Sequence, residues 1–562
     1  MKKPISVLLA ALFSVGMVGA AAGCQTKDTV VDNAETINVR VFKAGYGDAF
    51  VYELKQKFET YCANEGLNYK MNVLTPTYGS AGTAMIQEMS RGYQNTKIDL
   101  YITGAINPNQ VSPIGEYGEV CEDLRELVFN QTAIGYDGVE EEVIAEKLAD
   151  DFEPFMVADN GKMYGFNWVQ SVAGMVVNTV KLSAYGITEL PRTTNEMFEI
   201  FDIVYNGIPG VIEGSDKTKT YPITYNLTKG LGGAAGYNDC ALQSWLAQYD
   251  IETFNQFVRM EKLVDGEYVG LEEAYKVFDN PNLQPILEAG YQLMDMKYSA
   301  YGSSTQTLDQ AQGLIMKDAK KQNNAIFMLN GDWFLNEVKA NYASKLDNIE
   351  FMNVPVISAL GVKLFGAGTK YALSDEACDE LLSYMCKLVD ENKSVQEIIA
   401  SVKAEKNIDV DETDAQAVAT ARGAVYARGI EHQAFITKGC TKKHIAALVL
   451  RMMASNDFAE TFMEKANGVS PYSQNLETKS PYKFINQTKD LAANVHFRAV
   501  SARYQGLRAK VLKSDYMFPA IDNLALTLYT KASSKSYADA AKELYDSSLA
   551  KAKTAWDEYN EK

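Results

Sequence analysis

The residues of this sequence best suited to chemistry are aromatic and acidic side chains in short polar loops. Gly45-Tyr46-Gly47-Asp48 follows one apolar segment, residues 75–80 with Tyr78 follow a second, and Asp332-Trp333 follows a third. An aromatic face binds the apolar C–H surface of a ligand, while carboxylate and amide groups bind its hydroxyl groups. Glycine and aspartate also form ordinary turns, so the rings are the more specific part of the pattern. The loops predict binding of a neutral polar molecule.

Sequence motifs of the common enzyme classes are missing. There is no G-x-S-x-G elbow, H-E-x-x-H pair, Walker loop or G-x-G-x-x-G turn. The three histidines, His432, His444 and His496, lack the spacing of metal ligands or of a catalytic triad. We therefore expect no catalytic residue, no metal and no cofactor. The 72 acidic residues leave one alternative open, a cell-surface glycoside hydrolase or lyase with two carboxylates across the scissile bond.

Alternating strands and helices must position these loops. Apolar residues recur with period two over residues 37–41, 69–73 and 98–102, which predicts three strands. Helical spacing over residues 50–58 and 84–89 predicts a helix after each of the first two strands. This alternation is typical of an α/β fold with a parallel, doubly wound sheet. Ligands bind at the carboxyl ends of such strands, so the loops with Tyr46 and Tyr78 and residues 103–107 should share one rim.

Length and composition set the broad class. A chain of 562 residues, 47% hydrophobic and 22% charged, predicts about two to four globular domains. Its formal net charge of −18 argues against a nucleic-acid partner and against binding an anionic membrane by charge alone.

The N-terminus has the form of a bacterial export signal. Lys2 and Lys3 precede an apolar run over residues 5–18, which is too short to span a bilayer, and small residues lead to Cys24. The segment Ala21-Ala22-Gly23-Cys24 resembles a lipobox, which predicts a lipoprotein signal peptide over residues 1–23 and an acyl anchor, such as palmitate, on Cys24. The alternative is ordinary cleavage after Ala22. Residues 24–35 form a polar tether.

The other cysteines are scattered along the chain without a C-x-x-C pair, so neither zinc nor a redox dithiol is predicted. We expect buried free thiols. Export nevertheless permits disulfides, whose pairing the sequence does not assign.

Several segments together resemble one protein family. They are Gly161-Lys162-Met163-Tyr164-Gly165-Phe166, the helix start with Pro191, Thr193 and Glu196, the strand over residues 323–328 followed by Asn330-Gly331-Asp332-Trp333, the strand Val354-Pro355-Val356, Ala434-Phe435-Ile436, and Gly468-Val469-Ser470-Pro471. In order and spacing they resemble the carbohydrate-type extracellular solute-binding proteins of bacterial ABC importers, which are maltose-binding-protein-like. Asn167 and Thr194 depart from the family pattern, which has Pro and Trp there.

The resemblance implies a two-lobe, periplasmic-binding-protein-like α/β fold with several interlobe crossing segments and extra helical insertions. Lobe 1 would comprise residues 36–168 and 435–470, and lobe 2 residues 169–434 and 471–562. Residues 251–285 are expected to be charged and helical, and residues 372–429 form an insertion. Asp409, Asp411 and Asp414 in that insertion lack the Gly and Glu of an EF-type loop, so we expect no calcium site.

The resemblance also implies the function. A protein lipid-anchored on the outer face of the bacterial cell membrane would capture a carbohydrate, expected to be an oligosaccharide, in an interlobe cleft and deliver it to an ABC transporter permease. We expect a monomer. The candidate ligand-binding residues are Tyr46, Asp48, Tyr78, Trp168, Gln170, Tyr225, Asp332 and Trp333. Trp245 and Trp556 lie in helical apolar patterns and are expected in the core.

Overall fold

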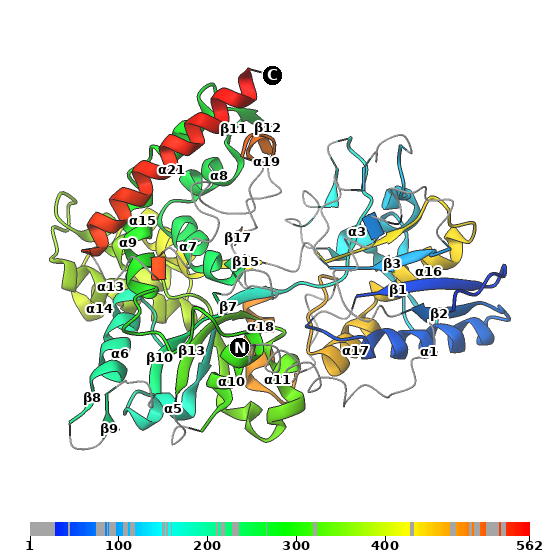
Figure 1. The fold of residues 1–562 in the computed structure, drawn as a ribbon, viewed down its shortest axis with the longest axis horizontal. Helices are drawn as coiled ribbons and strands as arrows, with labels where there is room; N and C mark the ends of the chain where they lie inside the picture. Colours follow the sequence, from blue (N-terminus) through cyan, green and yellow to red (C-terminus); the bar gives the residue numbers. More distant parts are fainter. Residues whose placement is uncertain are drawn as a thin grey trace, which may run out of the picture.

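Two β-sheets organise the chain. The computed structural model describes residues 29–561 except 43–44, 75–84, 87, 89–96, 105–110, 113–117, 149–151, 153–155, 159, 210–211, 215–219, 228–234, 266, 319–322, 428–431, 473–478, 494–496, 500–505, 513–527 and 530–534. Each sheet lies in one half of the molecule, and the two halves stand side by side (Figure 1).

The five-stranded sheet forms lobe 1. Its order is β2 (Lys70–Leu74), β1 (Thr36–Val41), β3 (Leu100–Ile102), β16 (Gln433–Ile436) and β6 (Phe166–Asn167). Ile37 and Val39 of β1 belong to one buried cluster with Phe50 and Leu54 of α1. The further elements of this lobe are α1 (Ala49–Asn64), a short π-helix (Arg125–Phe129), β4 (Thr132–Ile134), β5 (Glu140–Val143), α3 (Ile144–Lys147), α16 (Lys443–Met453) and α17 (Asn456–Ala466).

The six-stranded sheet forms lobe 2. Its order is β10 (Thr220–Thr224), β13 (Asn324–Gly331), β7 (Val172–Asn178), β15 (Ala424–Ala427) and β17 (Phe497–Ala499), and β14 (Ile349–Met352) also pairs with β7. Alternate residues of β7 enter different clusters, with Met175 and Val177 in one and Val172 and Val176 in the other. Both faces of this sheet are therefore covered, as expected for a central layer between helices.

Helices and short elements of lobe 2 surround this sheet. They are α5 (Thr179–Ala184), α6 (Thr194–Asn206), β8 (Gly207–Ile208), β9 (Ile212–Glu213), α7 (Ala235–Tyr249), α8 (Ile251–Arg259), β11 (Glu261–Val264), β12 (Glu267–Gly270), the 3-10 helix Ala274–Phe278, α9 (Leu283–Leu293), α10 (Leu308–Met316), α11 (Phe334–Tyr342), the 3-10 helix Ala343–Asn348, α12 (Ser358–Phe365), α18 (Lys483–Ala493), α19 (Gly506–Val511) and α21 (Tyr537–Asn560). The C-terminal α21 runs along the outer edge of lobe 2 (Figure 1).

Three expectations about elements are wrong in detail. The sheet of lobe 1 is mixed, because β16 pairs antiparallel with β3 and β6 while β1 is parallel to β2 and β3. A strand was expected at residues 354–356, but the strand in this region is β14, which begins five residues earlier at Ile349. Val356 forms only an isolated β-bridge to Thr193. The segment 251–285 is interrupted by the β11–β12 hairpin.

The insertion over residues 372–429 is helical, as expected. It contains α13 (Asp375–Asp390), α14 (Val395–Lys406) and α15 (Glu412–Arg422), and its end joins the sheet as β15. Within the described residues no group of His, Cys, Asp or Glu is placed to hold a metal ion. Trp245 is buried and its indole N–H donates to the carbonyl of Pro355 at 3.0 Å, whereas Trp556 is half-buried on α21.

The expectation of buried free thiols is confirmed. Cys62, Cys121, Cys240, Cys378, Cys386 and Cys440 are all free and buried. Burial raises the pKa of the Cys386 thiol to about 12, which keeps it protonated and unreactive. Among the described residues, no helix is both long and apolar enough to cross a membrane.

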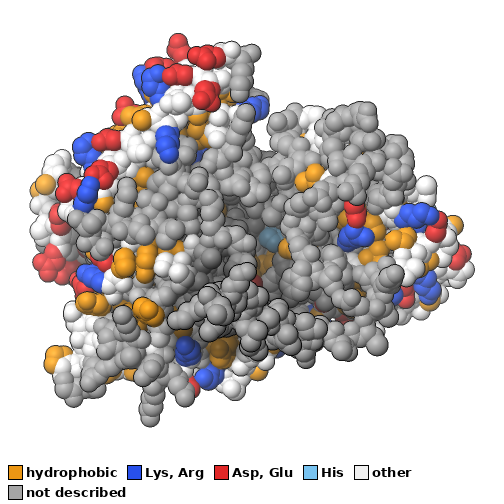
Figure 2. All heavy atoms as spheres, viewed as in Figure 1, with side chains coloured by type: hydrophobic (Ala, Val, Ile, Leu, Met, Phe, Trp, Pro, Cys, Tyr) orange, Lys and Arg blue, Asp and Glu red, His pale blue; other side chains and the backbone are white. Residues whose placement is uncertain are grey.

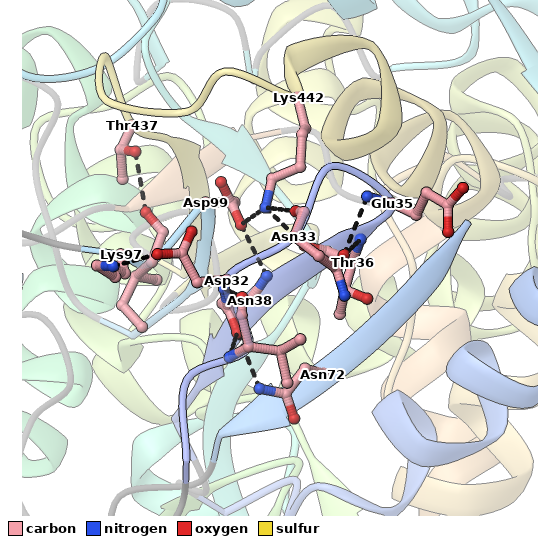
Figure 3. A network of polar contacts seen from close by, with 12 residues as sticks. Asp32, Asn33, Glu35, Thr36, Asn38, Asn72, Lys97, Asp99, Thr437 and Lys442 are labelled. Carbon is pink, nitrogen blue, oxygen red and sulfur yellow. Dashed lines mark hydrogen bonds and ion pairs between the residues drawn. The ribbon is translucent and has the colours of Figure 1, made fainter. Parts of the chain in front are cut away.

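A polar network fixes the entry of the chain into lobe 1 (Figure 3). The backbone N–H of Asn38 donates to Asp99 Oδ2 at 2.8 Å, and Lys442 Nζ lies 3.0 Å from the same oxygen. Lys442 also donates to the carbonyl of Thr36 at 2.6 Å, and Asn38 exchanges hydrogen bonds with the backbone of Val31. The network lies at the amino end of β1, whereas the loop with Tyr46 follows its carboxyl end.

Candidate functional site

Loops from the carboxyl ends of β1 and β13 meet between the two lobes. Tyr46 follows β1 in lobe 1, and Asp332 and Trp333 follow β13 in lobe 2. The Tyr46 hydroxyl donates to the Asp332 carboxyl group, at 2.9 Å from Oδ1 and 3.1 Å from Oδ2. Sequence positions 286 residues apart are thus brought into direct contact.

Trp333 fills the space between two glycines. A Cβ atom on Gly45 would lie 2.6 Å from Trp333 Cβ, and one on Gly331 would overlap the indole ring. The ring is 6% exposed and belongs to the buried cluster of lobe 1, although its backbone follows β13 of lobe 2. Trp333 is therefore a contact between the lobes.

Four rings gather around that of Tyr46, and we call the five together the interlobe ring cluster. It consists of Tyr46, Trp168, Trp333, His432 and Phe462. The Tyr46 ring meets those of Trp168, Trp333 and His432 nearly edge to face, with centroids 5.8, 6.2 and 6.2 Å away. Edge-to-face packing is the favoured arrangement of aromatic pairs, so the cluster is well packed as it stands.

The carboxyl group of Asp332 has a strongly raised pKa. Its side chain is fully buried, and this burial raises the pKa of the carboxyl group to about 8, against an ordinary value of 3.8. The Tyr46 hydroxyl and the backbone N–H groups of Asp332 and Trp333 act in the opposite direction, because they stabilise the anion. At neutral pH the group is mostly a neutral acid that can bind hydroxyl groups as both donor and acceptor.

Two candidates, Trp168 and Gln170, direct their side-chain N–H donors to backbone carbonyl groups of the protein. The Trp168 indole N–H donates to the carbonyl of Thr103 at 2.9 Å, and its ring stacks on Phe50 with centroids 5.5 Å apart. Gln170 Nε2 donates to the carbonyl of Ala492 at 2.6 Å, near the end of α18. Both residues lie between β6 and β7, in the segment that crosses between the lobes.

Tyr225 lies apart from the ring cluster. It follows β10, whose carboxyl end is parallel to that of β13, but its ring turns into the core of lobe 2. Its hydroxyl donates to the carbonyl of Leu293 at 2.6 Å. Leu293 ends α9, where carbonyl groups lack a partner within the helix, so Tyr225 completes that helix end. The structure therefore does not bring Tyr225 into the candidate site.

The remaining candidates are placed as follows. Asp48 is half-buried at the start of α1, two residues after Tyr46. Tyr78 and Cys24 lie outside the described residues, so their roles stay predictions.

His432 and Phe462 are site residues that the sequence reasoning missed. His432 lies just before β16, and its carbonyl accepts the backbone N–H of Trp168 at 3.2 Å. A signal for His432 exists in the sequence, because Ala434-Phe435-Ile436, one of the segments that carry the family resemblance, begins two residues after it. Phe462 lies on α17, and the structure brings the centroid of its ring to 5.4 Å from that of Tyr46.

The surface of the molecule is hollowed between the two lobes (Figure 2). The interlobe ring cluster joins the two lobes and brings aromatic rings together with the carboxyl group of Asp332. Such a combination binds the apolar and hydroxyl faces of a polar ligand, provided that the lobes part enough to expose the rings.

Solved structures with the same fold are sugar and solute receptors. The bacterial solute receptor AcbH, stated to prefer β-D-galactopyranose exclusively, is 13% identical with a TM-score of 0.52, over 94% of this chain and 99% of that one. A cyclic α-maltosyl-1,6-maltose binding protein from Arthrobacter globiformis is 13% identical with a TM-score of 0.53, over 93% and 100% of the two chains. A probable secreted solute-binding lipoprotein from Streptomyces coelicolor is 12% identical with a TM-score of 0.53, over 92% and 99%.

These likenesses confirm the expected two-lobe, periplasmic-binding-protein-like fold. No protein-family model and no curated protein sequence matches the chain.

Proposed function

We propose that this protein is a receptor that binds a carbohydrate between its two lobes and passes it to an ABC transporter permease, without chemical change. The observation that carries the proposal is the meeting of Trp333 and Asp332 from lobe 2 with Tyr46 from lobe 1. A ligand that replaces these contacts would bind both lobes at once and hold them closed, which is how hinge-bending receptors report occupancy. Similar folds in AcbH and the maltosyl-maltose binding protein support a sugar as the ligand.

A thermal-shift screen of the purified protein against a glycan panel tests this proposal. We expect one class of glycan to raise the melting temperature, because ligand at 100 times its dissociation constant adds about 2.7 kcal/mol to stability. That glycan should be recovered intact after prolonged incubation, as measured by chromatography. Cleavage of many glycan molecules per protein, co-purifying with the protein, would instead establish the hydrolase or lyase alternative.

We also propose that Cys24 carries the lipid that holds the receptor on the outer face of the membrane. The polar network at the amino end of β1 supports this arrangement, because the tether would join lobe 1 at the opposite end of the strand from Tyr46. An anchor at that end leaves the cleft accessible to ligand and permease. The lipoprotein from Streptomyces coelicolor, with its similar fold, supports it as well.

The variant Cys24→Ser tests the anchor. It should move from the membrane fraction to the medium, because it lacks the thiol that accepts the lipid, while its glycan affinity stays unchanged. Fractionation with immunoblotting measures the first effect and calorimetry the second. Retention of Cys24→Ser at the membrane would contradict the lipobox assignment.

A further inference from the structure

The start of α11 in lobe 2 contacts lobe 1 through side chains of its own. Asp332 and Trp333 lie directly before this helix, and Asn336 lies on its first turn, where its backbone N–H donates to the carbonyl of Trp333 at 3.0 Å. The first contact is the hydrogen bond from the Tyr46 hydroxyl to Asp332. One short segment of lobe 2 therefore carries every contact that follows.

The second contact joins α11 to the end of α17 in lobe 1 (Figure 1). Asn336 Nδ2 donates to the carbonyl of Ala466, and Asn467 Nδ2 donates to Asn336 Oδ1 at 2.6 Å. Ala466 ends α17, where carbonyl groups lack a partner within the helix, so Asn336 completes the end of a helix in the other lobe. The contacts form a set that we call the interlobe clasp, which consists of Tyr46, Asp332, Trp333, Asn336 and Asn467.

The groups of the interlobe clasp are satisfied by one another. Tyr46 is the one side chain among the described residues that hydrogen-bonds to the Asp332 carboxyl group, and its hydroxyl lies within 3.1 Å of both carboxyl oxygens. Trp333 fits against Gly45 so closely that an added Cβ there would overlap it. No polar side-chain atom of the clasp is among the buried atoms that lack a hydrogen-bond partner. Buried and paired contacts of this kind stabilise the closed arrangement of the lobes.

The side chain of Tyr46 makes the contacts that a sugar would make in the proposed site. Its ring meets that of Trp333 nearly edge to face, at an interplanar angle of 76°, while its hydroxyl binds Asp332. A pyranose would likewise present C–H groups to the indole and a hydroxyl group to the carboxyl group. Tyr46 and a sugar thus require the same two partners, Asp332 and Trp333.

We propose that the interlobe clasp holds the two lobes together and that Tyr46 is a built-in competitor of the glycan. The inference rests on the proposed function, because it concerns the regulation of the same site. A glycan binds only after the lobes part and Tyr46 leaves Asp332. The measured affinity is therefore the intrinsic affinity reduced by the fraction of protein in which the clasp is open.

The distance between the lobes, measured without glycan, tests the interlobe clasp. Spin labels on Gln56→Cys of α1 and Glu199→Cys of α6, both exposed positions, report this distance by double electron–electron resonance in the Cys24→Ser protein. The six other native thiols are buried and do not compete for label. Tyr46→Phe removes only the hydroxyl that binds Asp332, and we expect it to lengthen the mean interlobe distance by more than about 2 Å.

Tyr298→Phe is the matched control for Tyr46→Phe. The Tyr298 hydroxyl donates to Asp202 at 2.7 Å and its side chain is similarly buried, but both partners belong to lobe 2. Tyr298→Phe should therefore leave the interlobe distance unchanged. Asn336→Ala removes the second contact and should also lengthen the distance, so it serves if Tyr46→Phe fails to fold. An unchanged distance in both clasp variants, or an equal change in Tyr298→Phe, would overturn the proposal.

Glycan affinity tests the competition by Tyr46. The probes for calorimetry are D-galactose, maltose, raffinose and the best glycan of the thermal-shift panel. Each probe that binds the unchanged protein should bind Tyr46→Phe about two- to tenfold more tightly, the equivalent of one hydrogen bond, and Tyr298→Phe equally. Equal or weaker binding to Tyr46→Phe would refute the competition. Failure of the whole panel to bind would contradict the receptor proposal instead, and the distances would still decide whether the clasp exists.

Discussion

Replacing Trp333 with alanine should weaken glycan binding about thirtyfold or more and also lower the free energy of unfolding by about 3 to 5 kcal/mol. The affinity loss follows from the proposed stacking of sugar on this ring. The stability loss follows from its burial, because the indole fills the space between Gly45, Gly331 and Tyr46. Calorimetry on the folded protein and urea unfolding measure the two effects on one variant.

Two control variants separate recognition from packing. Trp333→Phe keeps an aromatic face and should retain most of the affinity. Trp556→Ala removes a half-buried indole from α21, where it stacks on Tyr559 with centroids 6.0 Å apart, and should leave affinity unchanged. If Trp333→Ala is strongly destabilised but binds glycan as tightly as the unchanged protein, Trp333 is a packing residue only.

The burial of Trp333 changes what the sequence had led us to expect. From the sequence alone, a tryptophan on a turn after Gly331 is expected to be partly exposed, and its replacement by alanine to lower the free energy of unfolding by less than about 1.5 kcal/mol. The turn is present, since α11 begins at Phe334. The partner surface comes from Gly45 and Tyr46 of the other lobe, and no local pattern around Trp333 encodes that contact.

The strands and the loops that follow them were predictable, because they depend on local periodicity. Apolar alternation located β1 and β2, and the carboxyl-end rule placed Tyr46 at the rim that faces lobe 2. The order of segments around Asp332 and Ala434 was sufficient to predict the two-lobe fold.

Side-chain direction was not predictable in the same way. Tyr225 and Trp333 both follow strands of one sheet, yet Tyr225 turns inward to the carbonyl of Leu293 while Trp333 crosses to lobe 1. The direction of each side chain depends on a contact with residues that are far away in the sequence. The same holds for Trp168, whose indole is bound by Thr103 rather than left open to ligand.

The variant Asp332→Asn should flatten the fall in stability between about pH 4 and pH 8. Burial raises the pKa of Asp332 from 3.8 to about 8, so the folded protein holds a proton that the unfolded chain releases. The stability that this proton contributes is full below pH 4 and is lost as the pH rises to about 8. The slope is about 1.4 kcal/mol per pH unit, and the whole interval corresponds to an upper value of roughly 6 kcal/mol.

Asparagine keeps an oxygen that can accept the Tyr46 hydroxyl but carries no charge, so Asp332→Asn should exceed the unchanged protein in stability above pH 8. Urea unfolding at each pH unit from 5 to 9 measures this difference. Parallel curves for the two proteins would show that Asp332 is already ionised in the folded state.

Glu337 provides a matched control for Asp332, because it is also a carboxyl group with a raised pKa but it does not contact the other lobe. Burial raises the pKa of Glu337 to about 7, and its side chain accepts a hydrogen bond from Gln312, so both partners lie within lobe 2. Glu337→Gln should therefore also flatten the pH dependence of unfolding, but it should leave glycan affinity unchanged at every pH. Asp332→Asn should change both quantities, because ligand entry must separate Asp332 from Tyr46. An equal and negligible effect of the two variants on affinity would place Asp332 outside the ligand site and leave it as a buried contact between the lobes.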